Sequence, residues 1–273
     1  MNTKDPLSPT ERESWRQIYY FSMYTHFNPD EAKGLKLHIL KKLNYSLFRY
    51  RKHSQREVDA VAENKIWFSL PKDNNDPFEF YCVPPKNDLV STIQALRIID
   101  PEFSEELLQL RTDKLYETNQ RLAQNFSICC FNESPYSELM WSHYASSHTG
   151  ICIEYDFAQE CFNHFLQPVF YTNKVPVFDQ TNKNADYMQI MTTKSDAWSY
   201  ENEWRLVYSA KYKGRQDAPP VKAIYLGARM KDEDKETWHN LAKMKNTFKL
   251  YELTLSKTHY ELCANPIFQP TVS

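Results

Sequence analysis

The stretch Trp198-Ser-Tyr-Glu-Asn-Glu-Trp-Arg-Leu-Val-Tyr208 alternates between charged and apolar residues. Side chains of an extended strand point alternately to its two faces. One face would carry Glu201, Glu203 and Arg205, and the other Trp204, Leu206 and Tyr208. The pattern predicts a strand over 201–209 that presents a carboxylate pair to one side, and the rest of the fold is built outward from it.

Two upstream segments are expected to pair with this strand. The segment 47–51, Leu-Phe-Arg-Tyr-Arg, predicts a strand with Arg49 on one face and Tyr50 on the other. The segment 66–70, Ile-Trp-Phe-Ser-Leu, predicts a second strand that contains Ser69. We expect all three strands in one sheet, with Arg49, Ser69 and Glu203 facing one cleft.

The remaining chain mixes helical and extended patterns. A capping box at 54–57 predicts a short helix between the first two strands. Further helices are predicted at 10–27, 30–43, 89–99, 103–125, 187–198 and 231–245, and further strands at 127–131, 150–155, 169–171, 221–226, 248–255 and 260–263. The segment 211–220 is predicted to be a polar linker. These elements predict one α+β domain over 46–273, with a mixed, split β-sheet core flanked by helices, and a helical N-terminal extension over 1–45.

Composition excludes several classes of protein. The 273 residues include only 4 glycines, and no glycine-rich phosphate loop or dinucleotide fingerprint is present. The formal net charge of −2 gives no basic excess for bulk capture of nucleic acid. No apolar run is long enough to span a membrane, and no cysteine–histidine spacing fits a zinc site. With no apolar signal segment at the start, we expect a cytoplasmic protein with reduced, buried thiols.

The carboxylate pair is the first candidate for chemistry. Side chains two positions apart on a strand have Cβ atoms roughly 6–7 Å apart. One carboxylate can stabilise a developing cation while the other positions a nucleophile. The alternative is that Glu203 and Arg205 form an ion-pair row on a solvated face, which is common on half-exposed strands. The neighbouring rings of Trp198, Tyr200 and Trp204 favour a site.

Other polar residues near the predicted strands are candidates for binding. Arg49 suits a phosphate or a carboxylate, or alternatively pairs with an acid such as Glu79. Ser69 can hold a ribose or orient a carboxylate, or is a satisfied core hydroxyl. Asn75 and Asp76 precede Pro77 and build at least a turn.

A dense group of rings gives the last candidates. Trp141, His143 and Tyr144 lie within four positions of one another. A histidine among rings can carry a proton or contact a ligand, although it is more often packed against a carbonyl. We expect Trp141 and His143 to border the same cleft as Glu203, and we expect no metal site.

Five spaced motifs together resemble a known family. They are Leu-Phe-Arg-Tyr-Arg (47–51), Trp-Phe-Ser-Leu-Pro with Asn-Asp-Pro-Phe-Glu (67–79), Cys-Phe-Asn-Glu-Ser (130–134), Met-Trp-Ser-His-Tyr-Ala with His-Thr-Gly-Ile-Cys-Ile-Glu-Tyr (140–155), and Trp-Ser-Tyr-Glu-Asn-Glu-Trp-Arg (198–205). Their order resembles the bacterial domain-of-unknown-function family numbered 2971, over about residues 45–230. That family name implies no activity.

A second resemblance does imply an activity. ADP-ribosyltransferases carry Arg or His on a first core strand, Ser or Tyr on the next, and E-x-E or a single Glu on a later one. Arg49, Ser69 and Glu201-Asn202-Glu203 occur in that order, although the usual Ser-Thr-Ser is Phe-Ser-Leu here. The loop with Asp76 and Glu79 has no counterpart in that pattern. The similarity is at the level of fold analogy.

The second resemblance implies an NAD-dependent transferase of a bacterial toxin or phage-defence system. Glu203 would stabilise the oxocarbenium-like state, Ser69 would orient Glu203, and Glu201 would position the acceptor. The remaining predicted contacts to NAD are Arg49, Tyr50, Asn75, Asp76, Glu79, Trp141, His143 and Tyr144. The acceptor would be a protein or a nucleic acid, and an antitoxin or operon partner is compatible with such a role. The alternative is a non-catalytic module of the same fold that binds a nucleotide or a protein.

Overall fold

The protein is described from a computed structural model, which covers residues 6–25, 28–83, 97–98, 100–177 and 183–271, without some side chains of two helices. The helices are α1 (Pro9–Tyr20), α2 (Pro29–Lys42), α3 (Gln55–Ala62), α5 (Pro101–Ala123), α6 (Glu138–Tyr144), α7 (Glu160–Asn163), α8 (Lys183–Met191) and α9 (Asp232–Lys245). Short helical turns are η1 (Phe21–Thr25), η2 (Pro71–Asp73), η3 (Asp196–Glu201) and η4 (Ala210–Tyr212). Most of the predicted helix at 89–99 lies outside the described residues.

Within the described ranges the strands fall into four sheets rather than one. They are β1 (Ser46–Arg51), β2 (Lys65–Phe68), β3 (Phe126–Phe131), β4 (Ile151–Asp156), β5 (Leu166–Pro168), β6 (Phe170–Thr172), β7 (Thr193–Ser195), β8 (Trp204–Ser209), β9 (Gly214–Asp217), β10 (Val221–Leu226), β11 (Lys249–Leu255) and β12 (Leu262–Phe268). The sheet orders are β1-β4-β10-β11-β12, β3-β8-β5, β2-β9 and β6-β7. The prediction of an α+β fold with a mixed sheet is confirmed.

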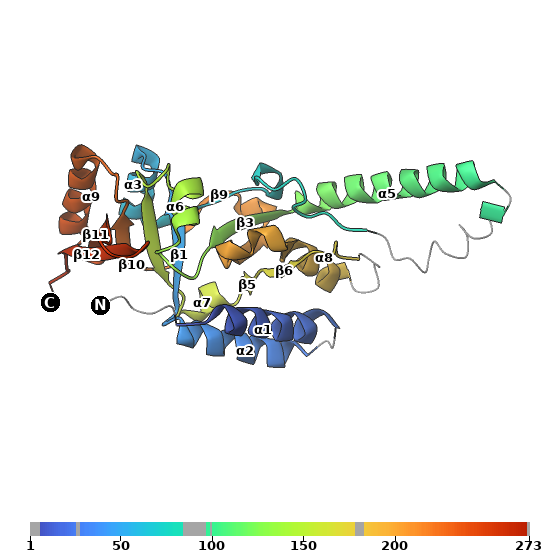
Figure 1. Ribbon diagram of the computed structural model, residues 1–273, viewed down its shortest axis with the longest axis horizontal. Coiled ribbons are helices and arrows are strands. Elements are labelled where there is room, and N and C mark those ends of the chain that lie inside the picture. The colour runs from blue at the N-terminus through green and yellow to red at the C-terminus, as the bar shows by residue number, and fades with distance from the viewer. Residues whose placement is uncertain (1–5, 26–27, 84–96, 99, 178–182, 272–273) are drawn as a thin grey trace.

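The five-stranded sheet is mixed because one of its pairings is parallel. β1, β4 and β10 pair antiparallel, β10 and β11 pair parallel, and β12 returns antiparallel to β11. The parallel pair needs a crossover, which α9 supplies between β10 and β11. These strands lie together at one end of the molecule (Figure 1).

The prediction that β1, β2 and β8 share one sheet is wrong. They belong to three sheets, which β3 connects. β3 pairs with β8 along its length. Single bridges just past the strand ends, Phe48 to Asn132 and Ser69 to Ile128, tie the β3 segment to the segments of β1 and β2. Because β3 is paired or bridged to all three segments, residues of each still reach one pocket.

The N-terminal helices pack on the body of the molecule and run side by side (Figure 1). Ser8 caps α1 through a capping box with Glu11, and Pro9 occupies the first turn. Trp15 on the inner face stacks on Trp204 with ring centroids 5.3 Å apart. Trp15, Ile39 and Leu40 belong to the same buried cluster as residues of β1, β4, β8 and β10.

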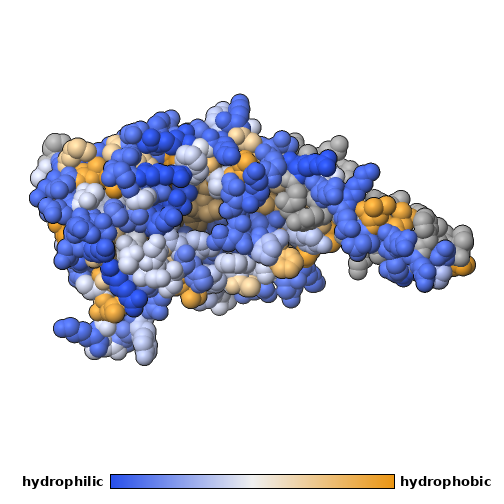
Figure 2. Space-filling model, turned by 90° about the horizontal axis from the view of Figure 1, so that it is seen from above, coloured by the Kyte–Doolittle hydropathy of each residue, from blue (hydrophilic) through white to orange (hydrophobic). Residues whose placement is uncertain are grey.

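One long helix departs from the rest of the molecule. α5 projects away from the sheets (Figure 1), and apolar residues are exposed on this arm (Figure 2). Leu110 of α5 is exposed. Elsewhere on the face in Figure 2 hydrophilic residues dominate. None of the helices within the described ranges is long and apolar enough to cross a membrane.

All six cysteines are free thiols. Cys82, Cys129 and Cys152 are buried as expected, whereas Cys161 is exposed. The prediction of buried thiols is therefore wrong at Cys161, which lies in the short helix α7 on the surface, and Cys130 and Cys263 are only partly buried.

Candidate functional site

A polar pocket lies where β1, β2 and β8 converge. Its volume is about 390 Å³, within the range of small-molecule sites. Its walls come from β1, β2, the loop that follows β2, the end of β3, α6 and the segment from β7 to Glu203. The lining residues are Arg49, Tyr50, Arg51, Arg56, Trp67, Ser69, Asp73, Asn74, Asn75, Asp76, Glu79, Cys130, Asn132, Met140, Tyr144, Lys194, Trp198, Glu201 and Glu203.

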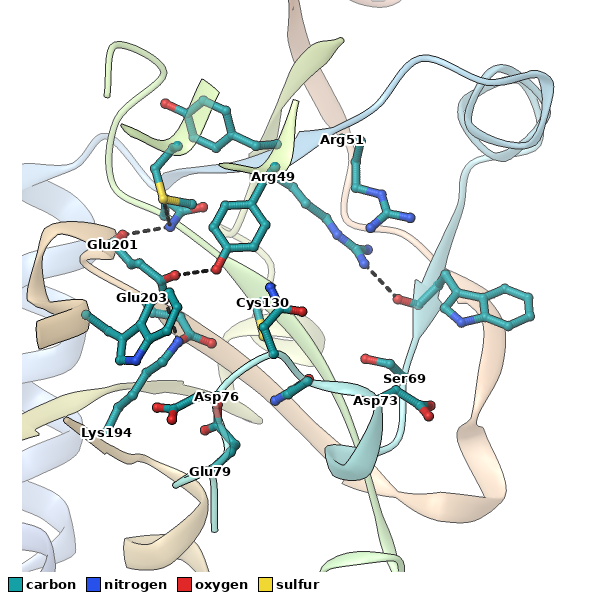
Figure 3. A pocket seen from close by; sticks show the side chains of 18 of the residues that line it. Arg49, Arg51, Ser69, Asp73, Asp76, Glu79, Cys130, Lys194, Glu201 and Glu203 are labelled. Atoms are coloured by element: carbon teal, nitrogen blue, oxygen red, sulfur yellow. Dashed lines mark hydrogen bonds and ion pairs between the residues drawn. The ribbon is translucent and has the colours of Figure 1, made fainter. Parts of the chain in front are cut away.

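Charge is divided between two ends of this pocket, as Figure 3 shows. Glu201, Glu203, Asp76 and Glu79 gather around Lys194 at one end. Arg49 and Arg51 lie at the other. A ligand that spans the pocket would therefore meet arginines, with Asp73 beside Ser69, at one end and the carboxylates around Lys194 at the other.

The two glutamates converge for a reason other than strand alternation. Glu201 ends the helical turn η3, and β8 begins only at Trp204. Asn202 between them has φ 45° and ψ 48°, the left-handed conformation that Asn tolerates better than most residues. The predicted strand over 201–209 is therefore wrong at its start, yet this turn brings both carboxylates to the pocket wall.

Buried cations hold Glu203 in place. Its oxygens accept from Arg205 Nε at 2.7 Å and from a terminal nitrogen of the same guanidinium at 3.0 Å. Lys194 Nζ lies 3.3 Å from Glu203 Oε2. Burial raises the pKa of the Glu203 carboxyl, but Arg205 and Lys194 outweigh it, and the pKa lies below the ordinary 4.5. The solvated ion-pair row considered from the sequence is wrong, because Glu203 and Arg205 are buried.

Glu201 has the opposite electrostatic environment. It accepts a hydrogen bond from the Tyr144 hydroxyl at 2.6 Å and one from Lys194 Nζ at 2.7 Å. Burial and the nearby charge of Glu203 raise the pKa of the Glu201 carboxyl above 4.5, against the influence of Lys194. Two adjacent carboxylates thus have pKa values shifted in opposite directions, an arrangement that in enzymes separates an ionised group from a proton-transferring one.

Glu79 and Asp76 reach the same end from the loop after β2. Glu79 Oε1 lies 2.6 Å from the Arg205 guanidinium, so Arg205 bridges two carboxylates. Asp76 is buried and its Oδ1 accepts from the backbone N–H of Phe78 at 2.9 Å. Its Oδ2 is also buried, and no hydrogen-bond partner for it occurs among the described residues. That oxygen can accept a hydrogen bond from a ligand.

The opposite end is rich in arginine. Arg49 donates to the carbonyl of Trp67 at 3.0 Å and has no carboxylate within ion-pair distance in the described chain. Arg51 pairs with Glu57 at 2.7 Å. Arg56 lies over the Trp67 ring, 3.8 Å from its centroid. Guanidinium groups without acidic partners suit a phosphate.

Ser69 lines the pocket but does not contact Glu203. Its hydroxyl donates to the carbonyl of Ile128 at 3.4 Å, because Ser69 bridges to β3 at this point. The predicted orienting role of Ser69 is therefore wrong in this structure. Arg205 and Lys194 orient Glu203 instead.

The ring cluster divides between the pocket and its surroundings. Tyr144 lines the pocket. Trp141 is fully buried in a separate core cluster and donates from its indole N–H to Pro135 O at 2.8 Å. His143 is exposed on the outer side of α6, near Tyr200. The prediction that Trp141 and His143 border the cleft is wrong, because the Trp141 ring is buried in the core beneath α6 and the His143 side chain faces solvent.

Tyr50, Asn75, Asp76 and Glu79 lie in the pocket wall. Tyr50 is mostly buried, since its hydroxyl donates to Ser134 O at 2.7 Å and its ring packs edge-on against Trp141. Its contact with the pocket is therefore small.

Sequence reasoning missed several residues of the site. Lys194 precedes the key stretch, and the helix predicted over 187–198 hid the short strand β7 and the turn η3. Lys194 Nζ lies 4.7 Å from the Trp198 ring centroid. Asn132 was also missed; its amide donates to Glu201 O at 2.6 Å and fixes the turn. Asn132 lies within the 130–134 motif of the family resemblance, whereas Lys194 carried no sequence signal.

Neither a metal centre nor an activated thiol is evident here. No group of three or more His, Cys, Asp or Glu side chains in the described part of the chain is arranged to hold a metal ion. Burial and Glu203 raise the pKa of the Cys130 thiol well above its ordinary value. Cys130 is therefore protonated at neutral pH and a poor nucleophile.

One family comparison gives a match. Residues 140–206 match the model of a family described as Protein of unknown function (DUF2971). The match confirms the resemblance to family 2971 over that segment, which contributes Tyr144, Lys194, Glu201 and Glu203 to the pocket but none of its arginines. No curated protein and no solved protein structure matches the chain.

Proposed function

We propose that this protein is an NAD-dependent ADP-ribosyltransferase-like enzyme that acts in the bacterial cytoplasm as a toxin or phage-defence effector. The observation that carries the proposal is the division of charge in the pocket. Arg49 lies at one end without an acidic partner, and Glu201 and Glu203 lie at the other. NAD has the matching arrangement, with an anionic pyrophosphate joined to a ribose that becomes cationic as nicotinamide leaves.

The two carboxylates divide the chemistry. Glu203 stays ionised because Arg205 and Lys194 lower its pKa, so it presents a fixed negative charge to the oxocarbenium-like state. Glu201 has a raised pKa and a hydrogen bond from Tyr144, which suits it to take a proton from the acceptor. Asp76 Oδ2 is available to a ribose hydroxyl. The acceptor is a protein or a nucleic acid, and an antitoxin or operon partner would restrain the activity.

A second function is supported by the same ion pairs. Arg205 and Lys194 already neutralise Glu203, which reduces the charge it offers to a cation. The alternative is therefore a non-catalytic module that binds a nucleotide or a partner protein in this pocket.

Release of nicotinamide from NAD distinguishes the two functions. We expect the wild type to release nicotinamide, and Glu201→Gln to slow the release by at least about 10²-fold, as for loss of one general acid–base group. Arg49→Ala should weaken NAD binding measured by calorimetry. NAD binding without nicotinamide release, with candidate acceptors present, would favour the binding module; no NAD binding at all would refute the enzyme.

A further inference from the structure

Trp67 is an exposed tryptophan whose position the fold does not require. β2 places Ile66 and Phe68 in the core, where they are 2% and 0% exposed. Trp67 lies between them on the other face and is 36% exposed. Its ring therefore lines the arginine end of the pocket, on the same side of the chain as Ser69.

The cation over the Trp67 ring is Arg56, and this ring is its one contact of this kind within the described structure. The Arg56 guanidinium lies 3.8 Å from the Trp67 centroid, and no ion pair or hydrogen bond of Arg56 is found there. Arg56 is also in the first turn of α3, where the helix dipole disfavours positive charge. Arg215, opposite Trp67 on β9, pairs instead with Glu63 at 3.0 Å. Arg56 thus covers the ring without being held there by a carboxylate.

The backbone of Trp67 connects this ring to the anion-binding end. Its carbonyl accepts the hydrogen bond from Arg49 at 3.0 Å, so the ring and the Arg49 guanidinium belong to adjacent parts of one wall. A planar ring beside two arginines without acidic partners matches a nucleoside 5′-phosphate, whose flat base lies one sugar away from its anion. Bases stack on exposed aromatic rings more strongly than an exposed arginine does.

We propose that Trp67 is the stacking platform for the base of a nucleoside 5′-phosphate, and that Arg56 and Arg49 hold the phosphate. The base takes the place of the Arg56 guanidinium against the ring, and the freed guanidinium turns to the phosphate. This inference rests on the proposed function, in that it assigns the adenylate half of NAD to the Trp67 end and the nicotinamide half to the carboxylates.

Calorimetry with AMP and with ribose 5-phosphate, which lacks the base, tests this platform on the full chain. Trp67→Ala should weaken AMP binding about tenfold or more, in line with the loss of one stacked base. Trp67→Phe keeps a ring and should restore most of the affinity. Ribose 5-phosphate should bind the wild type and Trp67→Ala within about twofold of each other. Tyr260→Ala, which removes an exposed ring outside the pocket, should bind AMP like the wild type.

The outcomes separate this inference from the enzyme proposal. AMP binding that depends on Trp67 supports the platform even if NAD is never cleaved. AMP binding that is equal in the wild type and in a folded Trp67→Ala variant overturns the platform, and so does a wild type that binds no AMP. Nicotinamide release by Trp67→Ala at an unchanged KM for NAD also overturns it, while leaving the enzyme proposal intact.

Discussion

Glu203 and Glu201 differ in what surrounds their carboxylates, and this difference determines how each responds to substitution. Glu203→Gln keeps the shape but leaves Arg205 and Lys194 without their shared carboxylate in the interior. We expect it to lower the free energy of unfolding by about 3–5 kcal/mol. Glu201→Gln retains an oxygen for Tyr144 and leaves Lys194 paired with Glu203, so it should change the free energy of unfolding by about 1 kcal/mol or less. Urea unfolding of the two variants measures both free energies of unfolding. Equal losses of stability would contradict the different roles given to Glu203 and Glu201.

The same residues predict opposite dependences on pH. The lowered pKa of Glu203 contributes stability above the ordinary 4.5, which is lost as pH falls toward the lowered value. The raised pKa of Glu201 makes its ionised form unfavourable in the fold, so its penalty develops as pH rises above 4.5. The stability deficit of Glu203→Gln should therefore shrink in acid, whereas the relative stability of Glu201→Gln should increase with pH. Urea titrations across this pH range give the dependence of stability on pH for both variants. The same dependence in both would argue against opposite pKa shifts of Glu203 and Glu201.

At the scale of single residues, the sequence indicated which residues lie in the pocket but not which contacts they make there. Glu201, Glu203, Arg49, Ser69 and Asp76 were chosen from local patterns, and the folded chain brings them to one pocket. The alternation that selected the glutamates was broken by Asn202, whose left-handed turn follows from tertiary context. Lys194 could not have been chosen, because its contacts with both carboxylates depend on a turn of the chain that no local pattern shows.

At the scale of elements, two glycines give opposite predictions for the same substitution. Gly227 follows β10, and a Cβ there would lie 2.2 Å from the carbonyl oxygen of His148. Gly227→Ala forces the backbone apart and should cost about 1–3 kcal/mol of unfolding free energy. Gly34 lies inside α2 with no atom within 4 Å of a built Cβ, so Gly34→Ala should add about 0.5–1 kcal/mol. Thermal and urea unfolding compare the two variants. A Gly227→Ala variant as stable as the wild type would show that the backbone around Gly227 and His148 can move apart at little cost.

Elements were predicted best where their own pattern was strong. The helix near 231–245 and the strand near 150–155 correspond closely to α9 and β4. β9 was missed because Gly214-Arg-Gln-Asp217 is polar and forms only a two-stranded ribbon with β2. The capping box predicted at 54–57 does not form, since the Ser54 side chain makes no capping hydrogen bond. The prediction of which strands share a sheet failed because strands pair with partners far away in the sequence, which local patterns do not reveal.

For the whole molecule, Glu133 connects the N-terminal helices to the sheets. It is 3% exposed and accepts from Arg12 and Arg16 at 2.6 Å each and from the Trp204 indole at 2.8 Å. Glu133→Gln removes the carboxylate that these two buried guanidinium groups share and should cost about 3–5 kcal/mol. Glu13→Gln, on the exposed face of α1, should change stability by less than about 0.5 kcal/mol. Denaturant midpoints test this, and a Glu133→Gln value close to that of Glu13→Gln would mean that α1 is only loosely docked.

The docking of α1 also has a consequence during synthesis. Arg12 meets Glu133 across 121 positions, and Arg16 meets the carbonyl of Glu203 across 187 positions. At the translation rate of about 5–20 residues per second, the Glu203 segment is made roughly 10–40 s after Arg16. For that interval Trp15 and both arginines have no folded surface to bury them. The nascent chain therefore exposes Trp15 and both arginines of the α1 segment long before the sheet that receives them exists.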